Sequence, residues 1–132
     1  MSLFERHLKV TKTDELVTIA TFLDREVMDG ETIAAIQQEL IRLVDDATRI
    51  KLLLDFTSVE FISSLTLGML VAVAKHVKKS QGQLRLCSLN RQLCEVIEIT
   101  ALQNLFTISP TQQAAVEWVK IVVSAGSMPI AR

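Results

Sequence analysis

The chain has 132 residues, of which 49% are hydrophobic and 22% charged, and its formal net charge at pH 7 is −1. This length fits one domain, and the near-neutral charge argues against binding to nucleic acid, which requires a basic surface. The longest apolar run, residues 69–74, is far shorter than the roughly 20 residues that span a membrane. With no secretion signal visible and no metal-type spacing of Cys87 and Cys94, we expect a cytoplasmic protein with reduced thiols and no membrane association.

The first half of the chain predicts a hairpin, a helix and a buried strand. Residues 8–11 and 16–21 have the residue preferences of strands, and the segment between them is polar, as in a hairpin turn. Asp29 and Gly30 mark a helix start, after which apolar residues recur at helical spacing. Residues 50–56 are a short apolar run of the kind found in strands that are covered on both faces.

The second half of the chain predicts helices alternating with strands. The predicted elements are a helix at 63–79 that stops near Gly82, a strand at 83–89, a helix at 91–99 and a strand at 105–108. Ser109 and Pro110 resemble an N-cap and a first helical residue, so a last helix is expected to run from there to about residue 123. Residues 124–132 lack periodicity and are expected to fray.

The element order is therefore ββαβαβαβα. Alternation of helices and strands after the hairpin predicts parallel strand pairing with right-handed crossovers. The fold class is α/β: one small domain, residues 1–123, with a mixed sheet of about five strands and about four helices.

A search for catalytic chemistry finds little. His7 and His76 lie far from any cysteine or carboxylate pair at metal-ligand spacing, and the glycines form no phosphate-binding loop. No G-x-S-x-G surrounds Ser63 or Ser64, and no base lies beside them in sequence. We therefore expect no enzyme, no metal and no cofactor.

The adjacent serines allow two interpretations. In the first, Ser63 is the N-cap of the second helix, and both residues serve only to start it. In the second, Ser64 receives a phosphate, because the free N–H groups and the dipole at a helix N-terminus favour negative charge.

The same helix has two apolar faces. One is an ordinary core stripe of Leu67, Leu70, Val71, Ala74 and Val77. The other gathers Leu65, Met69, Ala72 and His76 on the opposite side. Either another element of the chain covers this second face, or it is an exposed patch for a partner.

Two segments carry a family resemblance. "LLLDFTSVEFISSLTLG", residues 52–68, resembles the signature of STAS domains, the anti-sigma factor antagonists, which is roughly D-x-S-x-V-x-F-I-D-S-S-G-L-G. Residues 82–108 are similar to the second half of that family. The chain departs from the signature at Ser63, where the family has Asp, at Leu65, where it has Ser, and at Thr66, where it has Gly.

The resemblance implies a function in partner switching. In the family, the serine that matches Ser64 is phosphorylated by a partner that is both anti-sigma factor and serine kinase. The unphosphorylated antagonist binds this kinase and frees the sigma factor, and the phosphorylated form lets go. Ser63 is the second choice for the modification. The implied partner-binding residues are Asp24, Ser63, Ser64, Leu65, Thr66, Leu67 and Met69.

Two other functions remain open on the sequence alone. The chain could be a scaffold or homo-oligomerising STAS module that is not phosphorylated and uses the stripe from Leu65 to Met69. It could also be a regulatory domain for a small molecule, although no cluster of polar residues indicates a pocket.

Overall fold

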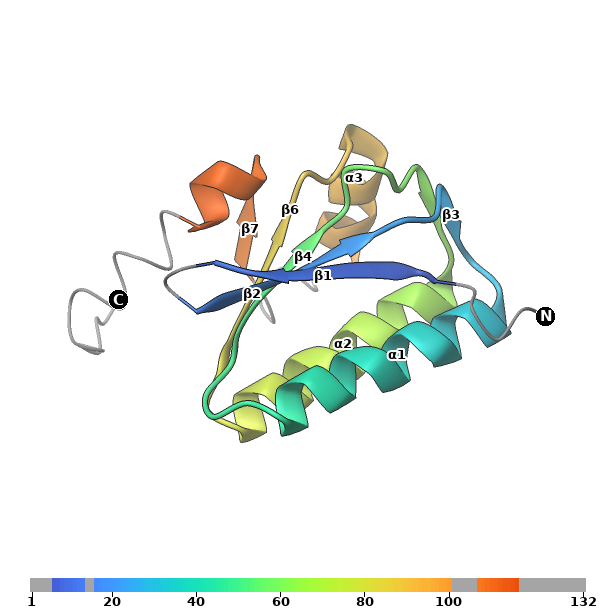
Figure 1. The fold of residues 1–132 in the computed structure, drawn as a ribbon. Helices are drawn as coiled ribbons and strands as arrows, with labels where there is room; N and C mark the ends of the chain where they lie inside the picture. Colours follow the sequence, from blue (N-terminus) through green and yellow to red (C-terminus); the bar gives the residue numbers. More distant parts are fainter. Residues whose placement is uncertain (1–5, 14–15, 101–106, 117–132) are drawn as a thin grey trace.

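A five-stranded mixed sheet forms the centre of the protein (Figure 1). The computed structural model describes residues 6–13, 16–100 and 107–116. The strands, in the spatial order of the sheet, are β1 (Leu8–Lys12), β2 (Val17–Phe22), β4 (Lys51–Asp55), β6 (Gln83–Cys87) and β7 (Thr107–Ser109). Among the described strands, β1 and β2 pair antiparallel and the later strands pair in parallel, so the predicted hairpin and the predicted parallel pairing are confirmed.

The central strand β4 is buried on both faces, as its continuous apolar run predicts. Leu52 and Leu54 belong to the main core beneath the helices α1 (Gly30–Asp45) and α2 (Ser64–Lys79). Leu53 belongs to a smaller cluster on the other face of the sheet. This alternation follows from the two-residue period of a strand, and it places β4 where both layers of the domain meet.

Helices α1 and α2 lie side by side across one face of the sheet, and α3 (Arg91–Ile99) lies near the opposite end of the molecule from their C-termini (Figure 1). Asp29 is the N-cap of α1, as predicted, and its carboxylate accepts the Thr32 N–H at 3.0 Å. That hydrogen bond lowers the pKa of Asp29. None of the helices in residues 6–13, 16–100 and 107–116 is long and apolar enough to cross a membrane.

The predicted register of α2 needs correction. Its buried residues are Thr66, Met69, Leu70, Val73, Ala74 and Val77. Leu70, Ala74 and Val77 point inward as predicted, but Leu67 and Val71 are only partly buried. Met69, on the face that the sequence left either covered by another element or open to a partner, is 2% exposed and therefore covered. The reason is that α2 packs against α1 as well as against the sheet, so its buried stripe is wider than one face and shifted toward Met69.

The predicted end of α2 near Gly82 is confirmed, but Gly82 has a different role from a helix-stop residue. The left-handed residue after the helix is Gln81, with φ of 62°. Gly82 lies instead against the backbone of Ile50, where an added Cβ would come within 2.6 Å of the Ile50 carbonyl oxygen. The absence of a side chain therefore lets the turn after α2 approach the start of β4.

Ser109, predicted as the N-cap of the last helix, has a different role. Ser109 is the buried last residue of β7, and its hydroxyl accepts a hydrogen bond from Arg85 Nε. Thr111 caps the following helical residues 112–116 instead, since its Oγ1 accepts the Ala114 N–H at 3.1 Å. The predicted positions 105–106, the predicted helix end near residue 123 and the predicted tail at 124–132 lie outside the described residues.

The sequence did not predict a second, two-stranded sheet. Strands β3 (Glu26–Val27) and β5 (Phe61–Ile62) pair in parallel, with Glu26 opposite Phe61 and Val27 opposite Ile62. In the chain, β3 comes just before α1 and β5 comes just before α2, so their pairing, the β3–β5 ribbon, links the starting points of the two helices.

Shortening Leu70 should strongly destabilise the domain. Leu70→Ala should lower the free energy of unfolding by about 2–5 kcal/mol, because the side chain is fully buried in the main core. Urea unfolding followed by circular dichroism measures the change. Leu16→Ala is a matched control, because Leu16 is 71% exposed. Equal losses in the two variants would contradict the packing of α2.

Candidate partner-binding site at the start of α2

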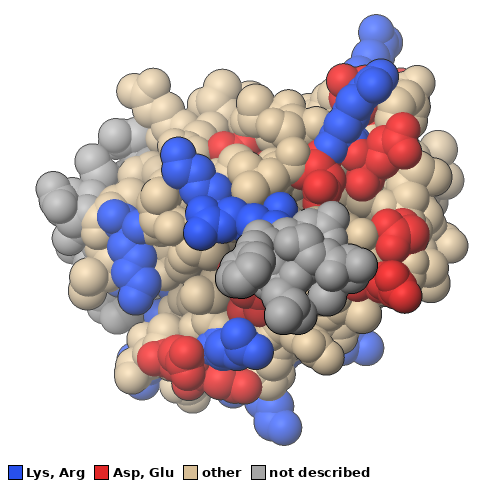
Figure 2. Space-filling view, turned by 45° about the vertical axis from the view of Figure 1, so that its right-hand side comes forward, with Lys and Arg blue, Asp and Glu red and all other residues tan. Residues whose placement is uncertain are grey.

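The first turn of α2 lies at one end of the molecule, together with the β3–β5 ribbon and the first turn of α1 (right-hand side of Figure 1). Figure 2 turns this end forward and shows acidic side chains gathered on the right-hand side of the face. The chain reaches α2 from the end of β4 through residues 56–63. The position of the adjacent serines therefore depends on how this connection is held.

Asp55 fixes the beginning of the connection. Its nearly buried carboxylate accepts the Thr57 N–H at 2.9 Å, the Thr57 hydroxyl, and the Gln112 side-chain amide at 2.8 Å. A buried carboxylate is tolerated when hydrogen bonds satisfy it. Asp55, the first residue of the signature, is thus a structural residue that organises the turn after β4.

The β3–β5 ribbon fixes the middle of the connection. The Arg25 carbonyl accepts the Glu60 N–H at 2.8 Å and the Phe61 N–H at 3.3 Å. The Arg25 side chain pairs with Glu60 at 3.0 Å and lies over the Phe61 ring, 5.9 Å from its centroid. Because both charged side chains are more than half exposed, the backbone bonds rather than the ion pair account for the ribbon.

Thr66 ties α2 to β3 from inside. Its fully buried Oγ1 accepts the Ser63 N–H at 3.1 Å and donates to the Val27 carbonyl. The first of these bonds is the half of a capping box that the residue at the third helical position supplies. Thr66 was expected to contact a partner directly, but its burial contradicts this expectation. The threonine that stands where the family has glycine therefore makes an internal contact.

The two serines differ in their surroundings. Ser63 is the N-cap of α2, as predicted, and its hydroxyl donates to the Met28 carbonyl at 3.0 Å. Ser64 is the first residue of α2 and is exposed. Within the described part of the chain, no hydrogen bond involves its hydroxyl. The first turn of α2 also has no acidic residue, so nothing in it offsets the positive end of the helix dipole.

Three exposed apolar residues belong to this turn or to the segments held against it. Leu65, which is 56% exposed, follows Ser64 in the chain, and Phe61 lies on β5. Met28 is the residue whose carbonyl accepts the hydrogen bond from the Ser63 hydroxyl. We call Met28, Phe61 and Leu65 the apolar group. Exposed apolar residues that cluster are typical of a binding surface. Leu67, also predicted at this surface, is partly buried against the core.

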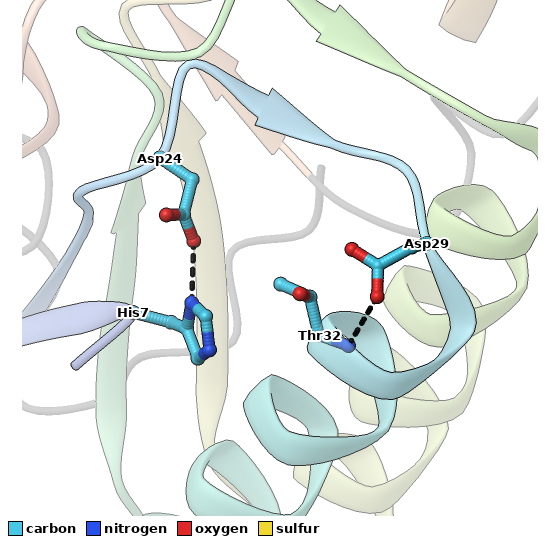
Figure 3. A network of polar contacts seen from close by, with 4 residues as sticks. All are labelled: His7, Asp24, Asp29 and Thr32. Carbon is cyan, nitrogen blue, oxygen red and sulfur yellow. Dashed lines mark hydrogen bonds and ion pairs between the residues drawn. The ribbon is translucent and has the colours of Figure 1, made fainter. Parts of the chain in front are cut away.

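Asp24 lies in the segment that leads into β3 (Figure 3). Its Oδ2 is 2.6 Å from Nδ1 of His7, and the Leu23 N–H bonds the His7 carbonyl at 2.9 Å. At the other end of the segment, Asp29 caps α1 through Thr32 (Figure 3). Residues 24–29 are therefore anchored at both ends, and they provide the carbonyls that hold Ser63 and Thr66. Sequence reasoning missed His7, because 17 residues separate it from Asp24.

The two cysteines are partly or fully buried, and His76 pairs with a carboxylate. Burial raises the pKa of the Cys87 thiol to about 11, so it stays protonated at neutral pH. Burial also raises the pKa of Cys94. His76 pairs with Asp45 at 2.7 Å near the C-terminal ends of α1 and α2, away from the serines. Among the described residues, no cluster of His, Cys, Asp or Glu could hold a metal ion.

Comparison with known proteins finds relatives of one kind. The family model described as STAS domain matches residues 7–115. A candidate anti-sigma factor antagonist of Bordetella bronchiseptica, BtrV, is 32% identical over 89 residues, which is 67% of this chain and 76% of the relative. The anti-sigma-B factor antagonist of Bacillus subtilis is 27% identical over 90 residues, 68% of this chain and 81% of the relative. An anti-sigma factor antagonist structure from Mycobacterium paratuberculosis has a TM-score of 0.74 at 26% identity, and the match covers 86% of this chain and 92% of that one.

The two apolar faces of α2 should respond differently to charge. Met69→Glu should cost at least about 3 kcal/mol of folding stability, because it places a carboxylate in the core. Leu65→Glu should change stability by less than about 1 kcal/mol, because Leu65 is mostly exposed. Thermal and urea unfolding of both variants measure this. If Met69→Glu melts like the parent protein, the packing of α1 against α2 is not as described.

Removing the Thr66 hydroxyl should loosen the start of α2. Thr66→Val keeps the shape but leaves the Ser63 N–H and the Val27 carbonyl without their partner. The loss should be about 1–3 kcal/mol for the buried carbonyl and less for the part-buried N–H. Thr66→Ser keeps the hydroxyl and loses one methyl group, so about 1 kcal/mol is expected. Urea unfolding measures both variants, and hydrogen exchange should show faster opening at residues 61–66 in Thr66→Val alone. Equal behaviour of the two would contradict the role of the hydroxyl.

Proposed function

Because the chain belongs to the STAS domain family, we propose that it is an anti-sigma factor antagonist that is switched by phosphorylation of Ser64. In this proposal the unphosphorylated protein binds an anti-sigma factor that is also a serine kinase, in the cytoplasm, and thereby releases a sigma factor. Phosphorylation by that kinase ends the binding. The named relatives of this kind support the antagonist function.

The observation that carries the proposal is the exposure of Ser64 at the first position of α2. A phosphate there adds a charge of about −1.5 to −2. The free N–H groups at the helix start and the absence of acidic residues in the first turn favour that charge. The folded domain should therefore accept the modification without rearrangement.

The apolar group explains why the same phosphate would prevent binding. A partner that covers Leu65, Phe61 and Met28 must also cover Ser64 or pass close to it. An unmodified hydroxyl loses little hydration free energy on such contact. A phosphate would lose much more, because its charge would be desolvated beside apolar atoms. In this scheme Leu65 contacts the partner, whereas Asp24, Ser63 and Thr66 hold the contact surface in place.

The structure weakens the sequence argument for the second candidate, an unphosphorylated scaffold or homo-oligomer. That argument used one apolar stripe from Leu65 to Met69, and Met69 is buried. What remains is the apolar group itself, which also suits the first candidate. Phosphate mapping distinguishes the two.

The direct test is incubation with the cognate anti-sigma factor kinase and ATP, followed by mass spectrometry. Phosphate is expected on Ser64. Ser64→Ala should bind the kinase and resist modification, and Ser64→Asp should bind at least tenfold more weakly, about 1.4 kcal/mol, with near-parental stability. Isothermal titration calorimetry measures binding.

Ser63→Ala is the matched control. It should lose about 0.5–2 kcal/mol of folding stability, because Ser63 helps to start the helix. It should still be phosphorylated. Phosphate on Ser63 would reverse the roles of the two serines. A kinase that is active and binds the chain but modifies neither serine would refute the switch and favour the scaffold.

A further inference from the structure

Helix α3 has a second apolar face that the core does not use. Leu93 and Ile97 are buried in the main core. Val96 and Ile99 lie on a different face, which they share with Gln92 and Glu95 at the i, i+3, i+4 and i+7 spacing of one helical side. Ile99 is 83% exposed. Ile99 therefore contributes little to the core of the described domain.

Strand β5 stands opposite this face, and a groove separates the two. The groove has a volume of 320 Å³ and is lined by Glu60, Phe61, Ile62, Gln92, Leu93, Glu95, Val96 and Ile99. We call it the β5–α3 groove. Asn90 joins its two walls, since its Oδ1 accepts the Leu93 N–H at 2.8 Å and its Nδ2 donates to the Glu60 carbonyl at 3.4 Å. The Asn90 side chain therefore connects the start of α3 to the backbone that leads into β5.

The charged side chains that line the groove are acidic. Among the described residues, Glu60 and Glu95 are the charged ones in its lining, and none of the described lysines or arginines belongs to it. Glu60 pairs with Arg25, and Glu95 pairs with Arg91 at 3.6 Å. Both arginines stand outside the lining, and their side chains are 67% and 92% exposed. Such exposed pairs contribute little and exchange easily for another cation.

We propose that the β5–α3 groove binds a segment of a partner protein that presents apolar side chains flanked by lysine or arginine. The apolar floor would accept the apolar side chains, and the two carboxylates would pair with the basic ones. The groove shares Phe61 with the apolar group beside Ser64, so one partner can contact both surfaces. That the partner is an anti-sigma factor rests on the proposed function, whereas the chemistry of the groove does not.

The test uses the full chain labelled with ¹⁵N and a synthetic amphipathic helical peptide of leucine and lysine. Titration followed by NMR should shift the amide signals of residues 60–62 and 92–99. A peptide of the same pattern with glutamate in place of lysine should not produce these shifts. Shifts that avoid both segments, or that are equal for the two peptides, would overturn the proposal.

Matched variants locate the contact. Ile99→Asn and Glu95→Gln should each weaken binding of the leucine–lysine peptide at least fivefold. Leu16→Asn should leave it unchanged, because Leu16 is a comparably exposed residue beside β2, outside the groove. Equal affinity of Ile99→Asn and Leu16→Asn would refute the groove as the binding site.

Two further outcomes separate this proposal from related ideas. Ser64→Asp should bind the peptide like the parent chain, because Ser64 does not line the groove, so a failed phosphorylation switch leaves the groove intact. If sedimentation without peptide shows a dimer that Ile99→Asn dissociates, the occupant is a second copy of the chain, and the proposal of a basic partner segment is wrong.

Discussion

The bond between the Thr66 hydroxyl and the Val27 carbonyl is the contact on which the whole site depends. It joins the first turn of α2 to a strand 39 residues earlier and is buried, so water cannot replace it at low cost. Val27 is itself held in the β3–β5 ribbon, between an anchor at Asp24 and His7 and another at Asp29 and Thr32. Through this chain of contacts, the beginning of β1 and the start of α1 both position the surface around Ser64.

Local sequence patterns were sufficient for the parts of the fold whose structure is decided locally. The hairpin, the start of α1 at Asp29 and the buried strand β4 follow from turn residues, capping and apolar period, and all three are confirmed. Patterns failed where distant contacts decide. Strands β3 and β5 have two residues each, too few to show a period, and Ser109 has a good capping sequence but remains in the sheet with Arg85.

The site was predictable to a similar degree and for the same reason. Ser63 and Ser64 could be placed at a helix start from sequence, because capping is local. The burial of Thr66 and Met69 could not, since a helical wheel shows that two faces of α2 are apolar but not that α1 covers one of them. The role of Asp24 as an anchor also needed the structure, because His7, the residue before β1, lies 17 positions earlier in the chain. Residues that the sequence assigned to the binding surface, such as Thr66 and Asp24, instead hold that surface in place.

The first turn of α2 contains three hydroxyls, and their different environments bear on why two serines stand side by side. The hydroxyls of Ser63 and Thr66 both donate to carbonyls of the segment before α1, those of Met28 and Val27. A phosphate on Ser63 would remove one of these bonds and bring negative charge against a carbonyl oxygen. A phosphate on Ser64 would break no bond found among the described residues and would extend from the exposed side of the turn. The geometry thus separates a structural hydroxyl from an available one, and this supports Ser64 over Ser63 as the position at which a modification can change binding while the fold persists.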